Sequence, residues 1–321
     1  MNNSLAVVLV ASGVAYGTPL LFAALGELLA ERSGVLNLGV EGMMLVGAVM
    51  GFWAVQSVHA TSGLALAFAF VIAALAGTAM AAIHAFLVVT LRANQIVSGL
   101  ALTIFAGAAG LSSYLGNNFN LADHPAAHIF GPLFPKGAQD LPVVGPVVFA
   151  QNVLVYISWA LVVAVGLYLG RTRPGLNLRA VGESPAAADT MGINVTAYRY
   201  AHTLVGGALA GVGGASITLA LTPQWVNGIT GGSGWIAIAL VIFAFWRPGL
   251  CLVGAYFFGA LQALAPQLQA RNISLGPTVL WTGSLPYLMT VFVLVVVASG
   301  TARRRLGAPS ALGVAYVREE H

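Results

Sequence analysis

The chain has 321 residues, of which 59% are hydrophobic and 7% are charged, and its formal net charge is +4. Soluble domains carry about 25% charged residues, so a soluble protein of this size could not cover its surface with so few charges. The apolar excess runs along the whole chain, and the N-terminus lacks the basic segment of a secretory signal. The single cysteine, Cys251, excludes an intrachain disulfide. This composition indicates a polytopic integral membrane protein.

Hydrophobic segments of membrane-spanning length follow one another along the chain. About 20 apolar residues in a helix cross a bilayer core of roughly 30 Å. The segments of this kind are 5–26, 35–57, 64–90, 96–116, 152–170, 200–221, 234–247, 249–267 and 285–300. Lipid cannot satisfy the edges of an open sheet, and the alternation typical of strands is missing. We therefore expect an all-α polytopic membrane protein with about eight to ten transmembrane helices, in a single domain over 1–321.

Basic residues predict how these helices are oriented. They flank the polar loop 171–199 and follow the last span, as Arg171, Arg173, Arg179, Arg199, Arg303, Arg304 and Arg305. The positive-inside rule assigns both groups to the cytoplasm. With nine spans, the tail 301–321 is then cytoplasmic, the N-terminus is outside, and 117–151 becomes a large external loop.

Motifs that carry catalysis are missing. The only lysine, Lys136, is followed by Gly137, so the sequence holds no Walker A loop for ATP. His124 and His128 lie four residues apart but have no third evident ligand, so we expect no metal site. Within the spans, hardly any ionisable side chain occurs beyond Glu41 and His84. Because intramembrane enzymes usually carry such groups, the sequence favours movement of a solute over a reaction.

Two glycine-rich segments interrupt the hydrophobic pattern. The first, ERSGVLNLGVEG, covers 31–42, and the second, GITGGSGW, precedes the short span in the second half. Broken helices line solute sites in transporters, because irregular backbone is tolerated in a membrane where it borders a cavity. The two interruptions would lie on oppositely oriented helices, so an inverted repeat with broken helices is expected.

Residues near these interruptions are the candidate solute contacts. Asn37 offers both a donor and an acceptor, Gly39 permits unusual backbone angles or close approach, and the ring of Trp235 could stack on a nucleobase. The expected pathway residues are Asn37, Gly39, Glu41, Gln95, Ser98, Asn227, Ser233 and Trp235. Structural alternatives stay open, because Glu41 could pair with Arg32 or Arg92 or cap a helix, and Trp235 could be an interface anchor.

The loop 171–199 contains a second candidate functional element. Its core, ESPAAADTMG, predicts a short helix with Ser184 as N-cap, Pro185 as first helical residue and Gly192 as the stop. A short surface helix of small residues suits either docking of a soluble partner or a solvated connection. The residues alone leave both interpretations open.

Several segments together resemble one family of transport proteins. GESPAAADTMGI resembles the coupling segment of ABC importer permeases. ERSGVLNLGVEGMMLVGA, ANQIVSGLAL, SLPYLMTVFVL and the tail RRRLGAPSALGVAYVRE are similar to the permease branch for nucleosides and simple sugars, which is related to branched-chain amino acid permeases. The resemblance covers essentially the whole chain, but 117–151 and 222–233 match no family-wide motif, which leaves the solute open.

The resemblance implies a set of partners in the bacterial cytoplasmic (inner) membrane. An extracytoplasmic solute-binding (lipo)protein would capture the solute, and this chain would form the pathway with a second, sequence-different permease. Cytoplasmic ABC ATPases would use the ATP, and this chain would contact membrane lipids but bind no cofactor and no nucleic acid. It would be a transport subunit and not an enzyme. The implied coupling residues are Gly182, Glu183, Ala186, Ala187, Asp189 and Gly192.

The solute and the transport class have rival interpretations. An uncharged polar pathway suits nucleosides or simple sugars better than branched-chain amino acids, whose charged groups want charged partners. An ion-coupled secondary transporter would need buried acids, of which the sequence has few, and a scaffold or receptor would need larger soluble parts. The expectation is an ATP-driven ABC importer permease for nucleosides or related small polar solutes.

Overall fold

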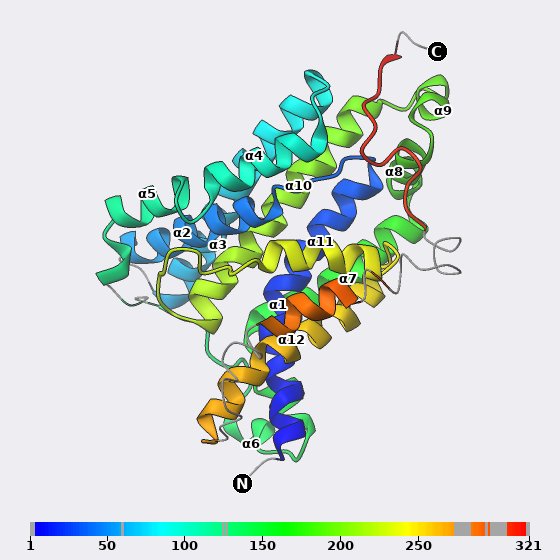
Figure 1. Ribbon diagram of the computed structural model, residues 1–321. Helices are drawn as coiled ribbons and strands as arrows, with labels where there is room; N and C mark the ends of the chain where they lie inside the picture. The colour runs from blue at the N-terminus through cyan, green and yellow to red at the C-terminus, as the bar shows by residue number, and fades with distance from the viewer. Residues whose placement is uncertain are drawn as a thin grey trace.

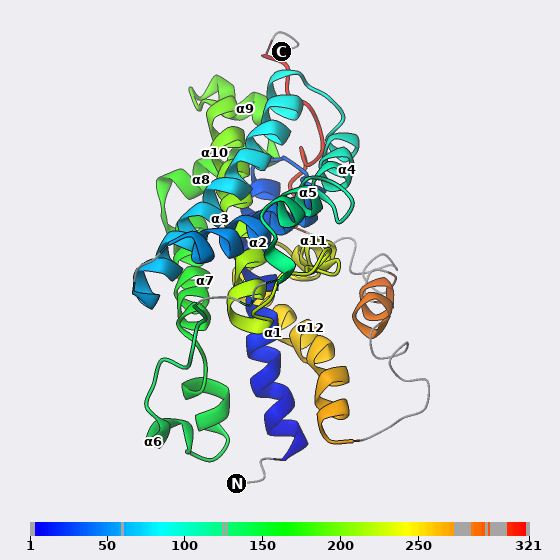
Figure 2. The same cartoon turned by 90° about the vertical axis from the view of Figure 1, so that its left-hand side faces the viewer.

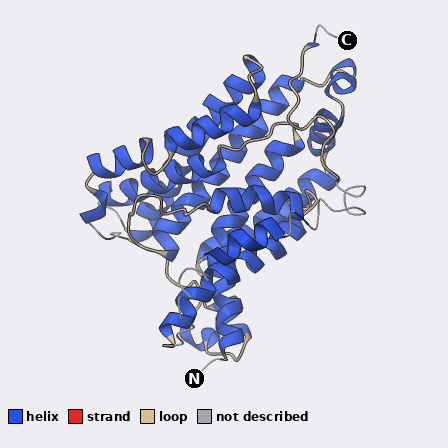
Figure 3. Cartoon of the chain, viewed as in Figure 1, coloured by secondary structure: helices blue, strands red, loops and turns tan. Residues whose placement is uncertain are grey.

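The computed structural model describes residues 4–58, 61–123, 125, 128–272, 284–292, 295 and 307–318. Within this part of the chain, helices dominate and are joined by loops (Figure 3). The β pairing found there is an isolated antiparallel bridge between Pro132 and Asn152. The prediction of an all-α membrane protein is confirmed.

Long apolar helices make up the body of the molecule (Figure 1). Among the described residues, 7 helical segments are long and apolar enough to cross a membrane. They are α1 (Leu5–Arg32), α2 (Val40–Ser57), α3 (Ser62–Ala85) with the π-helix η1 (Phe86–Thr90), α4 (Gln95–Ala106) with α5 (Leu111–Asn118), α7 (Val153–Arg171), α10 (Val195–Ser216) with the π-helix η4 (Ile217–Leu221), and α12 (Pro248–Ala270).

Short elements connect these helices. They are η2 (Leu121–Asp123), α6 (Lys136–Gln139), η3 (Gly145–Phe149), α8 (Arg173–Glu183), α9 (Pro185–Thr190) and α11 (Ser233–Phe243). Residues 284–292 are also helical, and the rest of the predicted span 285–300 lies outside the described residues except for residue 295.

The structure changes three of the predicted spans. The second begins at Val40 instead of residue 35, because 33–39 is not helical. The fourth is interrupted at 107–110, between α4 and α5. The seventh is α11, whose 11 residues measure about 16 Å at 1.5 Å per residue. This helix is therefore too short to cross a bilayer alone and instead follows a break.

Glycines allow the central helices to approach closely. The helix α1 packs along α10 and α12, and α10 also packs along α2 and α3. A Cβ atom added to Gly77 of α3 would collide with the carbonyl oxygen of Gly207 in α10. One added to Gly47 of α2 would collide with Gly211. Small residues at such crossings provide the packing that holds helices together in a membrane.

The two polar ends of the molecule lie far apart. The N-terminus and α6 are at one end, whereas α8, α9 and the C-terminal residues are at the other (Figures 1 and 2). Within the predicted external loop 117–151, α6 thus lies at the end opposite to α8 and α9 of the predicted cytoplasmic loop 171–199, as two sides of a membrane require. Which end faces the cytoplasm stays a prediction.

Candidate functional site

The break before α2 is held by side chains from neighbouring helices. The Leu36 N–H donates to Oε1 of Gln95 at 2.7 Å, and the Leu36 carbonyl lies 3.1 Å from Nε2 of His84. The Thr103 hydroxyl donates to the carbonyl of Leu38 at 2.9 Å. Backbone groups inside a membrane must find partners within the protein. The surrounding helices α3 and α4 therefore stabilise the non-helical conformation of 33–39.

Asn37 and Gly39 are both buried within this break. The Asn37 N–H donates to Oε1 of Glu27 at 3.1 Å, and the Asn37 side-chain oxygen accepts from Gly39 N–H at 3.0 Å. Gly39 has a φ of −83°, so of the two predicted reasons for a glycine here, unusual backbone angles do not apply. Its Cβ would instead lie 3.0 Å from Leu102 Cδ2, which explains a glycine by close approach. The positive φ of the break, +88°, belongs to Gly34.

Glu41 joins the first break to the second. Its carboxylate accepts hydrogen bonds from the Thr230 hydroxyl at 2.5 Å, from Gly232 N–H at 2.9 Å and from Gly234 N–H at 2.6 Å. Glu41 lies in the first turn of α2, and these donors surround the start of α11. Two helix N-termini therefore meet at one carboxylate, an arrangement that favours negative charge. Of the predicted structural roles of Glu41, helix capping fits these contacts. The helix that Glu41 caps is α11, and not α2, to which it belongs.

The Arg32 alternative does not fit these contacts. The Arg32 guanidinium donates instead to the carbonyl groups of Trp246 and Gly307. Among the described residues, the ion pair found joins Arg318 to Asp189 and does not include Glu41.

The loop between η4 and α11 depends on its glycines. Gly228, Gly231 and Gly232 have φ values of +74°, +52° and +81°. This left-handed region costs other residues energy but is freely available to glycine. The GITGGSG sequence thus permits the turn that directs the N–H groups of Gly232 and Gly234 toward Glu41.

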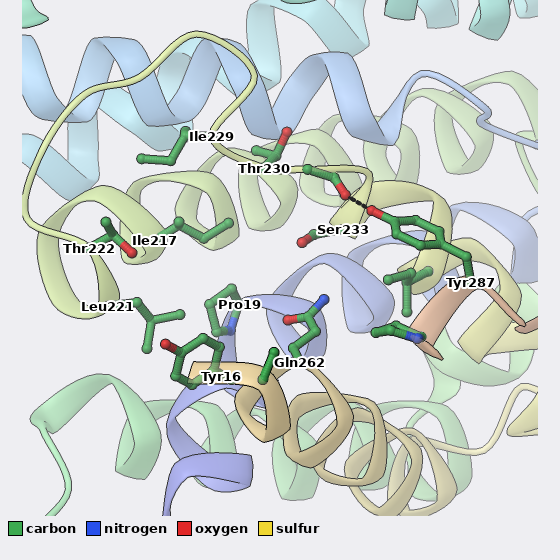
Figure 4. A pocket seen from close by; sticks show the side chains of 14 residues that line it. Tyr16, Pro19, Ile217, Leu221, Thr222, Ile229, Thr230, Ser233, Gln262 and Tyr287 are labelled. Atoms are coloured by element: carbon green, nitrogen blue, oxygen red, sulfur yellow. Dashed lines mark hydrogen bonds between the residues drawn. The ribbon is translucent and has the colours of Figure 1, made fainter. Parts of the chain in front are cut away.

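A cavity of about 260 Å³ lies beside this loop (Figure 4). Its polar lining includes Tyr16 of α1, Thr222, Thr230, Ser233 and Gln262 of α12, together with Tyr287. The Tyr287 hydroxyl donates to the carbonyl of Gly231, so it braces the same loop. The described lining residues carry no charged side chain. The cavity offers two aromatic rings and uncharged donors and acceptors, which suit binding of a small neutral polar solute.

The predicted pathway residues fall into three groups. Ser233 lines the cavity, and Glu41 lies behind its wall through Thr230. Asn37 and Gly39 lie within the break at 33–39, and Gln95 and Ser98 lie beside it on α4. Asn227 is exposed, and Trp235 packs against the hydrophobic core instead of lining the cavity. Their roles in solute contact stay predictions.

Several lining residues were not among the predicted pathway residues. Tyr16, Thr222, Gln262 and Tyr287 come from segments far apart in the chain and meet only in the fold. Among these residues, Gln262 alone could have been recognised from the sequence as a candidate pathway residue, because it is an amide within an otherwise apolar stretch of α12.

The short helix α9 forms as its sequence predicted. Ser184 is the N-cap, and its hydroxyl accepts from Ala187 N–H at 3.4 Å; Pro185 occupies the first helical turn. Gly192 follows the helix with a φ of +80°, in the left-handed conformation typical of a helix stop. Glu183, Ala187 and Gly192 are exposed, Ala186 and Asp189 are half-buried, and Gly182 is buried.

The coupling role that the family resemblance implies for Gly192 predicts that Gly192→Leu uncouples transport without unfolding the protein. A Cβ at Gly192 would meet no atom within 4 Å, so the cost is the left-handed backbone alone, about 1–2 kcal/mol. That cost distorts the end of α9 and leaves the core intact. Uptake and ATP hydrolysis should be measured side by side, with Gly137→Leu as the matched control because its surroundings are equally open. Normal uptake by Gly192→Leu would contradict the coupling role.

The fold and the site define a class of protein. A multi-pass bundle with a neutral cavity beside a broken helix, and an exposed short helix at one polar end, has the features of the membrane permease of a transporter. The chain belongs to the family described as the permease component of the branched-chain amino acid transport system, which matches residues 9–297.

Relatives that are named as ABC transporter permeases match nearly the full chain and support this assignment. A Haloferax volcanii protein whose name proposes a glucose ABC transporter permease is 42% identical, covering 98% of this chain and 99% of the relative. The nucleoside ABC transporter permease protein of Lactococcus lactis is 33% identical, with 98% of each chain covered. The guanosine ABC transporter permease protein of Bacillus subtilis is also 33% identical, with 97% of each covered. No solved structure gives a significant match.

Family membership confirms the resemblance drawn from the sequence. The chain is a multi-pass permease subunit of an ABC transport system, a transport subunit and not an enzyme. Such a subunit works with an ATPase and a substrate-binding protein.

Proposed function

We propose that this permease carries a nucleoside through the cavity beside α11, as part of an ATP-driven importer. The observation that carries this proposal is the lining of the cavity. Tyr16 and Tyr287 provide flat rings, and Thr222, Ser233 and Gln262 provide uncharged hydrogen-bonding groups. A nucleobase can stack on such rings, and the ribose hydroxyls can bond to the polar groups.

The same lining disfavours a branched-chain amino acid. A zwitterion buried without charged partners loses its hydration at a large cost, and the described lining residues are uncharged. The cavity of about 260 Å³ is near the lower limit of roughly 300 Å³ for ligand pockets, which suits one small solute. Two relatives are named for nucleoside and guanosine. A simple sugar is the second candidate, favoured by the relative whose name proposes glucose.

The wider proposal completes the transporter. A second, sequence-different permease forms the other half of the pathway, and a cytoplasmic ATPase binds the ATP, so this chain binds no cofactor. The N-terminus lies outside a bacterial cytoplasmic membrane, and α8, α9 and the C-terminus lie in the cytoplasm, with lipids around the spans. The separation of the two polar ends (Figure 2) supports their lying on opposite sides of the membrane, and the basic residues of 171–199 favour the cytoplasmic side for α8 and α9. An external binding protein delivers the solute.

Uptake by the whole transporter tests the solute. Proteoliposomes that hold both permeases and the ATPase, supplied with the binding protein, should accumulate labelled guanosine in preference to glucose or leucine when ATP is present. This chain purified alone should hydrolyse no ATP. Accumulation of glucose alone would replace the nucleoside proposal by the sugar alternative, and ATP hydrolysis by the isolated chain would contradict its role as a permease.

Replacing Gln262 with leucine should weaken solute uptake. The variant loses one uncharged hydrogen bond to the solute, worth about 0.5–1.5 kcal/mol, so the apparent affinity should fall about 2- to 12-fold. The matched control is Gln269→Leu, since Gln269 lies on the same helix but is exposed and does not line the cavity. Equal uptake by the two variants would remove Gln262 from the pathway.

A further inference from the structure

The described C-terminal residues 307–318, which we call the strap, run across the polar end of the molecule (Figure 1, red). The strap makes backbone hydrogen bonds to two separate elements. The Ala311 N–H donates to the carbonyl of Gly182, at the end of α8, at 2.9 Å. The Gly313 N–H donates to the carbonyl of Gly34, in the break before α2, at 3.2 Å. The strap therefore connects the coupling region directly to the break.

Both acidic residues of the predicted coupling segment bind the strap. The Ser310 hydroxyl donates to Oε1 of Glu183 at 2.6 Å. Oδ2 of Asp189 accepts from the Tyr316 hydroxyl and lies 3.0 Å from Nε of Arg318. The family resemblance implies that Glu183 and Asp189 belong to the ATPase-coupling segment. In the structure they also hold the strap beside α9.

Arg199 holds the middle of the strap. Its side chain is buried, with the whole residue only 2% exposed, and Nη1 donates to the carbonyl of Val314 at 3.0 Å. A Cβ on Gly34 would lie 3.1 Å from Nη2 of Arg199. Among the described residues, Nε and Nη2 of Arg199 have no hydrogen-bond partner, so loss of the strap would leave this buried cation without the Val314 acceptor as well, which is costly.

The break at 33–39 connects the strap to the cavity through α2 and Glu41. Segment 33–39 leads directly into α2, whose Glu41 binds Thr230 and the first N–H groups of α11. Thr230 and Ser233 line the cavity. A continuous series of hydrogen-bonded elements thus runs from α9 through the strap, the break and Glu41 to the cavity wall. Such a series can carry a movement between distant sites only if both sites bias the same element.

We propose that the strap forms the ATPase-docking surface together with α9 and transmits the movement of docking to the break at 33–39. The partner is the cytoplasmic ABC ATPase, so this inference rests on the proposed function. Met191, just after α9, is 81% exposed, and Val314 of the strap is 56% exposed. Tyr316 and Arg318 of the strap both bind Asp189 of α9, so the strap and α9 form one surface, and a docked ATPase would bury these apolar side chains favourably.

Cysteine labelling tests the docking surface without any transport assay. In a Cys251→Ala background, Val314→Cys should react with a water-soluble maleimide in the assembled permease pair. Addition of the ATPase should slow this reaction at least fivefold, a change within the usual range of coupling. The control is Leu133→Cys in the predicted external loop 117–151, whose native side chain is also exposed and lies outside the membrane-spanning helices. An unchanged rate at residue 314 in a complex that does contain the ATPase would overturn the proposed surface.

Strap variants test the transmission. The pair Asp189→Asn and Tyr316→Phe, combined in the full transporter, removes the ion pair and the tyrosine hydrogen bond. We expect the solute moved per ATP hydrolysed to fall at least about fivefold, while the ATPase still co-purifies. The control Tyr114→Phe should leave this ratio unchanged. A merely structural strap would lower the folded yield and leave the ratio intact, and this result would overturn the proposal.

The two proposals fail in different ways. If the wild-type transporter shows no ATP-driven uptake, the proposed function is wrong. If the wild type transports and the strap variants match its ratio of transport to hydrolysis, only the strap inference is wrong.

Discussion

Replacing Glu41 with glutamine should abolish solute uptake. The Glu41 carboxylate accepts from the Thr230 hydroxyl and from the N–H groups of Gly232 and Gly234. Glutamine keeps one oxygen, but its amide group is a donor and would face donors in the loop. Each buried donor left unpaired costs about 1–3 kcal/mol, and the charge at two helix N-termini is lost as well, worth about 0.3–2 kcal/mol. The loop that forms the cavity wall would then leave its position.

Comparison with other variants separates the possible roles of Glu41. Thr230→Val removes a single donor and should reduce uptake only in part, whereas Asp140→Asn, in an exposed loop, should have no effect. Folded yield should be followed by size-exclusion chromatography in detergent, and uptake by labelled solutes. A capping role predicts the loss of uptake for every solute. Normal uptake of a changed set of solutes by Glu41→Gln would show that the carboxylate contacts the solute directly.

The helix α9 could be predicted closely because its signals are local. Ser184, Pro185 and Gly192 occupy the cap, the first turn and the stop, and each acts on the backbone within a few residues. No distant part of the chain is needed to form these contacts. The sequence therefore supplied the position, the length and both ends of this helix.

The sequence predicted where the two helix breaks lie, but it did not predict which residue performs which role within them. Glycines marked both places, yet the left-handed backbone belongs to Gly34 and not to Gly39. Which glycine adopts a positive φ depends on how α4 and the strap pack against the break. Helix capping was likewise among the predicted roles of Glu41, but the donors it binds lie far along the chain, the separation to Thr230 alone being 189 positions. A single sequence carries no signal for that pairing.

The cavity and the strap were beyond sequence reasoning for related physical reasons. Helices in a membrane are apolar on the face toward lipid as well as on the face toward the core, so hydrophobic periodicity cannot show which face is inside. Hydrophobic periodicity therefore could not show that Tyr16 and Gln262 line the same cavity. The strap has no periodic pattern, and two of its attachments use backbone groups of Ala311 and Gly313, which any sequence possesses.

Replacing Gly39 with leucine should prevent folding of the permease more than it blocks the pathway. A Cβ at this position would already lie 3.0 Å from both Asn37 Oδ1 and Leu102 Cδ2, and leucine adds three more carbon atoms. Overpacking of a tight core costs about 1–3 kcal/mol or more. The helix α4 cannot move aside freely, because Gly99 packs against the backbone of Leu38.

A graded series makes this expectation testable. Gly39→Ala should lower the thermal unfolding midpoint in detergent slightly, and Gly39→Leu should lower it further and reduce the folded yield. The matched control is Gly63→Leu near the start of α3, where an added Cβ meets no atom within 4 Å, and it should behave as wild type. A pathway role for Gly39 would give the opposite balance, with blocked passage and little harm to folding. If Gly39→Leu keeps the wild-type yield and midpoint but stops uptake, then the break faces the pathway, and the solute route runs past Gly39 as well as through the cavity beside α11.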